Sequence, residues 1–157
     1  FYFSYMNYEY PRLVRNAAGA HVLNSLYGIR LHAQRRRVGL DALPFASLNS
    51  ITLLGAEIVG RSYGGGMLKH EPKEADLLPM PSIEVLGEAE PRLKRLHEKI
   101  SVLLREPEIA PAIDLVDRVL LQGIMKVTPR QISLLRKARG ILFQRRIVRG
   151  KGQNGAN

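Results

Sequence analysis

The residues best suited to chemistry form one short segment, residues 60–69, which reads GRSYGGGMLK. Three consecutive glycines lose much backbone freedom on folding, so a fold retains them for a reason. That reason is either a tight turn with positive φ or the close approach of a ligand such as a phosphate. Cations on both sides and two hydroxyl groups favour a turn that contacts nucleic acid, and a glycine-rich hairpin beside a packed tyrosine is the alternative. The candidate DNA contacts here are Arg61, Ser62, Tyr63, Gly64, Gly65, Gly66 and Lys69.

Positive charge is concentrated in the second part of the chain. Residues 1–91 carry nine Lys or Arg and nine Asp or Glu, whereas residues 92–157 carry fifteen basic and five acidic residues. No acidic residue follows Asp117. A field of one sign indicates a polyanionic partner, most commonly nucleic acid, and a basic surface kept for solubility is the alternative. Further candidate DNA contacts are Arg35, Arg36 and Arg37, in a predicted loop, and Arg139 and Arg146, on the last predicted helix.

The sequence offers no catalytic or metal-binding set. It contains no Cys, and its four His show no ligand spacing. Asp114 and Asp117, three residues apart, are expected to pair with Arg118 or with the basic final helix. No apolar run approaches the roughly 20 residues of a membrane span, and no signal-peptide pattern begins the chain. These features predict a cytoplasmic protein with no membrane partner, and the first residue, which is not Met, suggests a part of a longer protein.

The hydrophobic periodicity predicts an α+β fold, in which a small mixed sheet with a packed helix is followed by an all-helical tail. Short strands are expected before residue 32, one of them at residues 20–23. A helix is expected over residues 43–59, with Pro44 in its first turn and Gly60 at its end. Residues 82–90 are expected to form a linker. We therefore predict an α+β recognition domain in residues 1–85, a helical basic extension in residues 86–150 and a disordered tail in residues 151–157.

Three helices are predicted after the linker. The first begins at Pro91, the second ends near Gly123, and the third begins at Thr128 with a capping-box pattern. On the third helix the apolar residues fall within one arc, which is expected to face the core. That arc consists of Leu134, Leu135, Ala138, Ile141 and Leu142.

The glycine-rich segment resembles the C-terminal region of adenine-N6 DNA methyltransferases of the gamma class. In that family an LN-S helix precedes a G-R-S-Y-G-G-G-x-L-K-x-E-P-x-E segment, and an L-P-x-P strand follows. The matching positions here are Leu48, Asn49, Ser50, residues 60–69, Glu71, Pro72, Glu74 and residues 78–81. The resemblance extends over roughly residues 4–149 and is most specific in this central part.

The resemblance implies the target-recognition part of a restriction–modification enzyme. Its catalytic domain would bind S-adenosylmethionine and flip the target adenine out of the duplex. The aromatic-x-Gly-x-Gly and Asn-Pro-Pro-Tyr/Phe motifs of that domain are absent from this sequence, so the chain itself is expected to hold no cofactor and no catalytic residue. The expected partners are double-stranded DNA, the missing N-terminal methyltransferase domain and a cognate restriction endonuclease. A stand-alone DNA-specificity subunit and a basic RNA-binding module remain alternatives.

Overall fold

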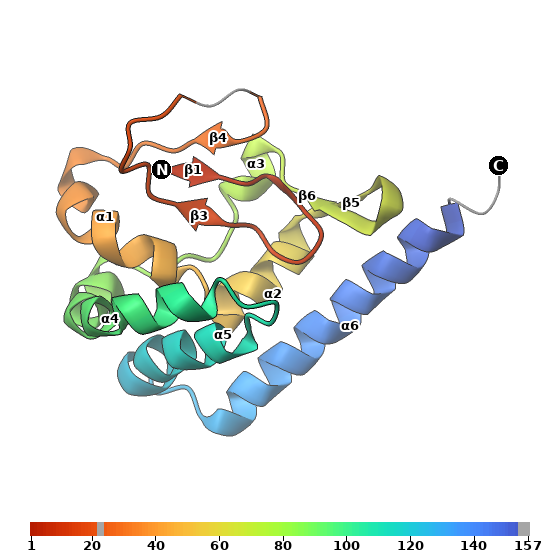
Figure 1. The fold of residues 1–157 in the computed structure, drawn as a ribbon. Coiled ribbons are helices and arrows are strands. Elements are labelled where there is room, and N and C mark those ends of the chain that lie inside the picture. Colours follow the sequence, from red (N-terminus) through yellow and green to blue (C-terminus); the bar gives the residue numbers. More distant parts are fainter. Residues whose placement is uncertain (22–23, 154–157) are drawn as a thin grey trace. The chain divides into compact units, whose positions relative to one another are not determined.

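The computed structural model describes residues 1–21 and 24–153, and of residues 151–153 it describes the backbone alone. Within these residues the fold is α+β, as predicted, with six α-helices and two three-stranded antiparallel sheets (Figure 1). The chain divides into two compact units. The first comprises residues 1–29, 51–79 and 134–157, and the second comprises residues 30–50 and 80–133. Segments of the two units alternate along the chain. The sequence predicts a single domain boundary near residue 85, and this boundary stays a prediction.

The first unit contains both sheets. In one sheet β1 lies between β3 and β4, and in the other β6 lies between β2 and β5. The strands are β1 (Tyr2–Phe3), β2 (Met6–Asn7), β3 (Leu13–Val14), β4 (Tyr27–Gly28), β5 (Arg61–Tyr63) and β6 (Met67–Lys69). The N-terminal segment therefore supplies the centre of one sheet and an edge of the other. Of the strand predicted at residues 20–23, residues 22–23 lie outside the described part of the chain.

The first unit also contains helices, and buried side chains of its strands and helices form its core. The helices are α2 (Ser50–Val59), the single turn α3 (Pro72–Ala75) and most of α6 (Pro129–Gln153). Leu53 and Ala56 of α2 are buried, as are Phe3 and Leu68 of the strands. The His70 Nε2 atom, directly after β6, lies 3.0 Å from the Ala56 carbonyl, so α2 approaches the end of β6. The prediction of a helix packed on the face of a sheet stays a prediction.

The N-terminus of α6 has the predicted capping box. The Thr128 hydroxyl accepts a hydrogen bond from the Gln131 backbone N–H at 3.3 Å, and the Gln131 side-chain oxygen accepts one from the Thr128 backbone N–H at 2.9 Å. Two donors that the helix leaves unpaired are thereby satisfied. The helix continues to Gln153, so residues 151–153 of the predicted tail are helical, and residues 154–157 lie outside the described residues.

The second unit is helical. It contains α1 (Ala33–Ala46), α4 (Ile83–Leu103), α5 (Ala110–Asp117) and the π-helical turn η2 (Arg118–Ile124). The prediction of a linker over residues 82–90 was wrong, because α4 begins there. Ser82 caps the helix by accepting a hydrogen bond from the Val85 N–H, and Leu86 and Ala89 extend the buried stripe that Leu93 and Ile100 continue. Pro91, predicted at a helix start, lies inside this helix.

The helix predicted over residues 43–59 is in fact two helices, α1 and α2. The Asn49 side chain donates to the Ala46 carbonyl at 2.7 Å, and the Ser47 hydroxyl donates to the Pro44 carbonyl at 2.8 Å. Such side-chain bonds to nearby carbonyls compete with the helical ladder and favour a break. Asp117 accepts hydrogen bonds from the Ser50 backbone N–H at 2.8 Å and the Ser50 hydroxyl at 2.6 Å, at the start of α2. Its predicted pairing with a cation stays a prediction.

None of the described helices alone is both long and apolar enough to cross a bilayer. The bent pair Ala33–Ala46 with Ser50–Val59 reaches that length and hydropathy only when the two helices are taken together. In the same residues no group of three or more His, Asp or Glu side chains is arranged to hold a metal ion.

Candidate functional site

The glycine-rich segment forms a β-hairpin made of β5, a 3₁₀ turn at Gly64–Gly66 and β6. Arg61 lies opposite Lys69, and Tyr63 lies opposite Met67. Directly opposed residues of an antiparallel pair project to the same face, so Arg61, Tyr63 and Lys69 share one face of the hairpin. The Lys69 ammonium lies 5.0 Å from the centroid of the Tyr63 ring, within the range of a cation–π contact.

The three glycines of the turn do not have equal surroundings. Gly65 and Gly66 have φ values of 70° and 79°, a region that L side chains rarely adopt. A Cβ atom on Gly64 would meet nothing within 4 Å, and one on Gly65 would meet only the Tyr8 hydroxyl at 3.9 Å. On Gly66 it would lie 3.1 Å from the Ile147 Cα atom of α6. The turn is therefore open at its first two residues and closed against a helix at the third.

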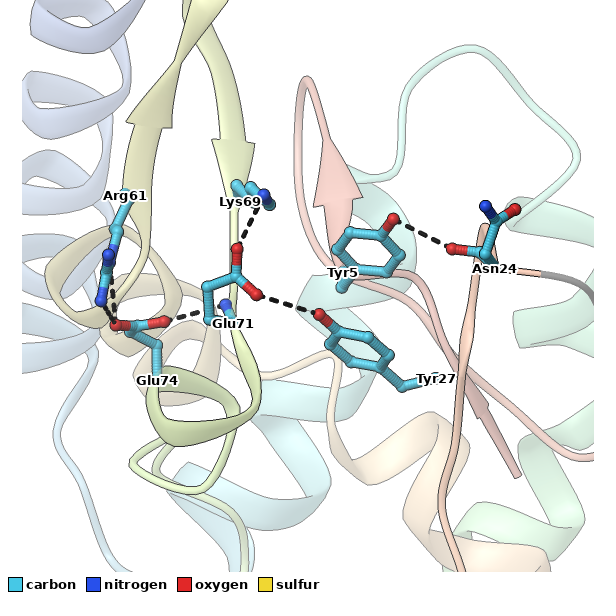
Figure 2. A network of polar contacts seen from close by, with 7 residues as sticks. All are labelled: Tyr5, Asn24, Tyr27, Arg61, Lys69, Glu71 and Glu74. Atoms are coloured by element: carbon cyan, nitrogen blue, oxygen red, sulfur yellow. Dashed lines mark hydrogen bonds and ion pairs between the residues drawn. The ribbon is translucent and has the colours of Figure 1, made fainter.

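The cations of the hairpin are paired with carboxylates that follow it in sequence. The Arg61 Nε donates to Glu74 Oε1 at 2.8 Å, and Lys69 Nζ lies 2.7 Å from Glu71 Oε1 (Figure 2). Glu74 also accepts from the Glu71 backbone N–H at 2.9 Å and so completes the capping box of α3. The two pairs join α3 to the hairpin and leave these four side chains with no net charge.

The pKa values of these groups follow from the pairing. The hydrogen bond with Lys69 lowers the pKa of Glu71 below its ordinary value, and the same bond raises the pKa of Lys69. The hydrogen bond with Arg61 lowers the pKa of Glu74. These shifts favour the charged forms of Glu71, Glu74 and Lys69 at neutral pH, which maintains the pairing.

Two tyrosines that sequence reasoning did not select extend this network. Tyr27 of β4 donates its hydroxyl to Glu71 Oε2 at 3.3 Å and stacks on the Tyr5 ring, with centroids 4.3 Å apart (Figure 2). The Tyr5 hydroxyl donates to the Asn24 carbonyl at 3.0 Å. Burial, and then the charge of Glu71, raise the pKa of Tyr27. From sequence, Tyr5 and Tyr27 lie in the region where short strands were expected, and that pattern does not indicate which ring meets which carboxylate.

Helix α6 closes the other side of the hairpin turn. Arg146 is 4% exposed and forms an ion pair of 2.8 Å with Glu57 of α2, whose side chain is 2% exposed. The Arg146 guanidinium also donates to the Tyr8 carbonyl at 2.9 Å and to the Gly66 carbonyl. This arginine therefore links α6 to Gly66, directly after the open glycines, and to Tyr8, directly after β2.

Arg139 lies about two helical turns before Arg146 and also forms a hydrogen bond within the protein. Its guanidinium donates to the Glu9 carbonyl at 2.9 Å, and burial lowers its pKa. Arg139 and Arg146 were both predicted to contact DNA. The structure places both side chains on the inward side of α6, where Arg146 is buried and Arg139 is half-buried, and each donates to backbone or side-chain oxygens of the protein.

Comparison with known families identifies the chain. The family model of the Type II methyltransferase M.Eco57I, C-terminal domain, matches residues 1–121. The chain belongs to this family. Neither a curated protein nor a solved structure matches it significantly. The matched segment includes the hairpin and its carboxylate partners, whereas α6 lies beyond it.

The basic triplet of this methyltransferase C-terminal domain lies on a helix. Arg35, Arg36 and Arg37 are exposed in the first turns of α1, so the prediction of a loop was wrong. No acidic residue occurs in the first turn of α1, so the positive end of the helix dipole adds to these charges. The triplet belongs to the second unit, whereas the hairpin belongs to the first. The structure therefore gives two separate sets of candidate contacts.

Proposed function

We propose that this chain is the target-recognition domain of an S-adenosylmethionine-dependent adenine-N6 DNA methyltransferase of a restriction–modification system. Membership in a family of methyltransferase C-terminal domains supports a catalytic part that precedes this domain and a DNA substrate. A cognate restriction endonuclease and a cytoplasmic location belong to the same proposal. The observation that carries the DNA-binding role is the hairpin tip, by which we mean Tyr8, Tyr63, Gly64 and Gly65.

The hairpin tip has the chemistry for approach to a nucleic acid. Tyr8 and Tyr63 are 56% and 55% exposed, and each presents an aromatic ring and a hydroxyl group. Between them Gly64 and Gly65 carry no side chain, so their backbone amides can come close to a phosphate or a base edge. Tyrosine hydroxyls can donate to phosphates or bases, and the flat rings can stack against sugars and exposed bases.

The tip is also held in place before any ligand binds. Arg146 donates to the carbonyl of Tyr8, within the tip, and to the carbonyl of Gly66, which directly follows it. The pairs of Arg61 with Glu74 and of Lys69 with Glu71 hold the strands of the hairpin on α3. A binding element that is already ordered loses less conformational entropy on association, which favours specific recognition.

Electrostatic attraction to DNA must come mainly from outside the hairpin. Arg61 and Lys69 are each balanced by a carboxylate, although the Arg61 side chain is 67% exposed and can exchange Glu74 for a phosphate. Exposed arginines are available on α1, in the basic triplet, and on α6 at Arg149, next to Gly150, which packs against the hairpin turn. Each phosphate that such a residue neutralises adds to the salt dependence of binding.

Substitution of Tyr63 in the whole methyltransferase tests the role of the tip. We expect Tyr63→Ala to weaken binding to the recognised sequence by about tenfold, since a specific base contact contributes roughly 1–3 kcal/mol. Binding to unrelated duplex should change little. Leu77→Ala, at a residue that is 69% exposed in the same unit, is the matched control. Equal site preference in the Tyr63 variant and the unmodified enzyme would remove the tip from DNA recognition.

A second pair of variants separates contact from bracing at Arg61. If Arg61 contacts a phosphate, Arg61→Ala lowers both the affinity and the salt slope, and Glu74→Gln raises the affinity because the competing carboxylate is neutral. If Arg61 only braces α3, both variants lower the melting temperature and leave the salt slope unchanged.

Detection of N6-methyladenine in digested product DNA would test the reaction itself, and another methylated base would overturn the adenine assignment.

A further inference from the structure

The side of α6 that faces away from the hairpin carries a row of exposed apolar residues. Leu134, Ile141 and Val148 are 58%, 59% and 66% exposed. They are spaced seven residues apart, so they lie on one side of the helix, and we call them the outer stripe. The opposite side carries Ile132, Arg146 and Gly150, which are buried. Figure 1 shows α6 as one long, unbroken helix.

A row of this kind differs from scattered surface hydrophobics. Single exposed apolar residues are ordinary, but a seven-residue repeat along a helix is typical of a seam that packs against a second helix. Two further positions complete the seam, because Ala138 and Arg145 each lie four residues after a member of the outer stripe. Arg145 is exposed and would be covered in such a contact.

The charge around the outer stripe restricts its occupant. Lys137, Arg145 and Arg149 are exposed beside it, and no acidic residue occurs after Asp117. A second copy of the chain would bring like charges together at this seam, which is destabilising. Duplex DNA would satisfy the cations but would place three aliphatic side chains against a hydrated phosphate backbone. A helix with apolar residues at the same spacing and flanking carboxylates satisfies both features.

We infer that the outer stripe is the docking face for an acidic amphipathic helix in the catalytic part of the methyltransferase. The partner helix places aliphatic residues against Leu134, Ile141 and Val148 and a carboxylate opposite Arg145. The catalytic part is the chosen source because covalent linkage to this domain gives it a millimolar effective concentration. The inference rests on the proposed function only in assuming that catalytic part, and it makes no use of the hairpin tip.

Photo-crosslinking in the whole methyltransferase tests the docking face. Benzoylphenylalanine replaces Ile141, and in a control enzyme it replaces Ile58, which is 64% exposed on α2. We expect the probe at position 141 to crosslink to an Asp- or Glu-containing helical segment of the catalytic part, at a yield at least several times that of the control. A crosslink to DNA, to a second copy or to neither above the control would overturn the inference. Binding to anionic lipid vesicles that needs Ile141 would also overturn it.

Charge reversal supplies an independent check on the same enzyme. Arg145→Glu, combined with the probe at position 141, should lower the crosslink yield several-fold while leaving the melting temperature of the domain unchanged, since Arg145 is exposed. An unchanged yield would exclude a carboxylate opposite Arg145. The experiment is done without DNA, so loss of the crosslink and loss of sequence preference in the Tyr63 variant are separate results. Failure of one leaves the other standing.

Discussion

Replacement of Arg146 by Met distinguishes a structural arginine from a DNA-contacting one. Arg146 lies 4% exposed on the inward side of α6 and makes two hydrogen bonds to Glu57, one to the Tyr8 carbonyl and one to the Gly66 carbonyl. Met has a similar length and is apolar, so it fills the space without replacing any donor. The change leaves the Glu57 carboxylate buried without its counter-ion.

The expected loss of stability is large. Removal of one partner of a buried ion pair costs about 3–5 kcal/mol, because the remaining charge is uncompensated. For a domain of this size 1 kcal/mol corresponds to roughly 2–4 °C in melting temperature, so a decrease of about 10 °C is expected. The double variant Arg146→Met with Glu57→Met removes both charges. It should regain more than half of the loss, because an apolar pair of similar volume is often as stable as a buried ion pair.

Urea and thermal unfolding of the single and double variants give the coupling between the two residues, and DNA titration of the same proteins gives their affinity. We expect a strongly destabilising single substitution and a substantial recovery of stability in the double variant. A single change below about 1 kcal/mol would refute this expectation. Loss of DNA affinity in a fully stable Arg146→Met protein would instead support the sequence-based prediction that this arginine contacts DNA.

Two further expectations concern stability. Gly66→Ala should destabilise the protein by roughly 2 kcal/mol, because φ is 79° and the new Cβ would lie 3.1 Å from the Ile147 Cα atom. Gly64→Ala, the control, should change the free energy of unfolding by no more than about 0.5 kcal/mol. Equal melting temperatures of the two variants would contradict this expectation. Burial lowers the pKa of His70, whose Nε2 lies 3.0 Å from the Ala56 carbonyl. As the pH drops through about 6.5, the unfolded chain binds a proton at this histidine before the folded protein does, so the stability should fall. The stability should level off below the folded pKa. Denaturant unfolding between pH 5 and 8 checks this, and a His70→Phe variant with the same pH slope would exclude His70 as the cause.

Local rules predicted several features correctly. The capping box at Thr128 is confirmed, since its pattern concerns only neighbouring residues. Glycine at positive φ in the turn at residues 64–66 follows from the same kind of local argument. Periodicity also predicted a helix over residues 43–59, of which α2 covers residues 50–59, and a tail made of helices. These signals depend on a few adjacent side chains, which the sequence displays directly.

The burial of α6 could not be read from its apolar pattern. The arc expected to face the core included Leu134 and Ile141, and both are exposed. The inward side is determined instead by Arg146, which forms an ion pair with the buried Glu57 of α2. Glu57 lies 89 residues earlier in the chain. Predictions from hydrophobic periodicity place arginine on the solvent side of a helix. Where a buried carboxylate pairs with an arginine, the side of the helix that is actually buried therefore differs from the predicted side.

The same limit applies to the charges of the hairpin. From sequence, Arg61 and Lys69 appear as two cations beside a flexible turn, and the carboxylates that follow at Glu71 and Glu74 appear as part of a separate helical turn. In the structure the four form two ion pairs. The sequence shows which residues are close along the chain, but it does not show that Glu71 and Glu74 pair with the cations of β5 and β6. These pairs neutralise two cations that were predicted to contact DNA.

Helix α6 links the two surfaces proposed for this domain. Its inward side holds the hairpin tip through Arg146, which bonds to Tyr8 and Gly66, and its outward side carries the outer stripe. A helix is stiff along its length, so a catalytic part docked on the outer stripe would be held at a set distance from the tip. Disturbance at either face would then alter which base reaches the active site without a change in the chemistry there. One buried arginine and one apolar seam would together define the geometry between recognition and methyl transfer.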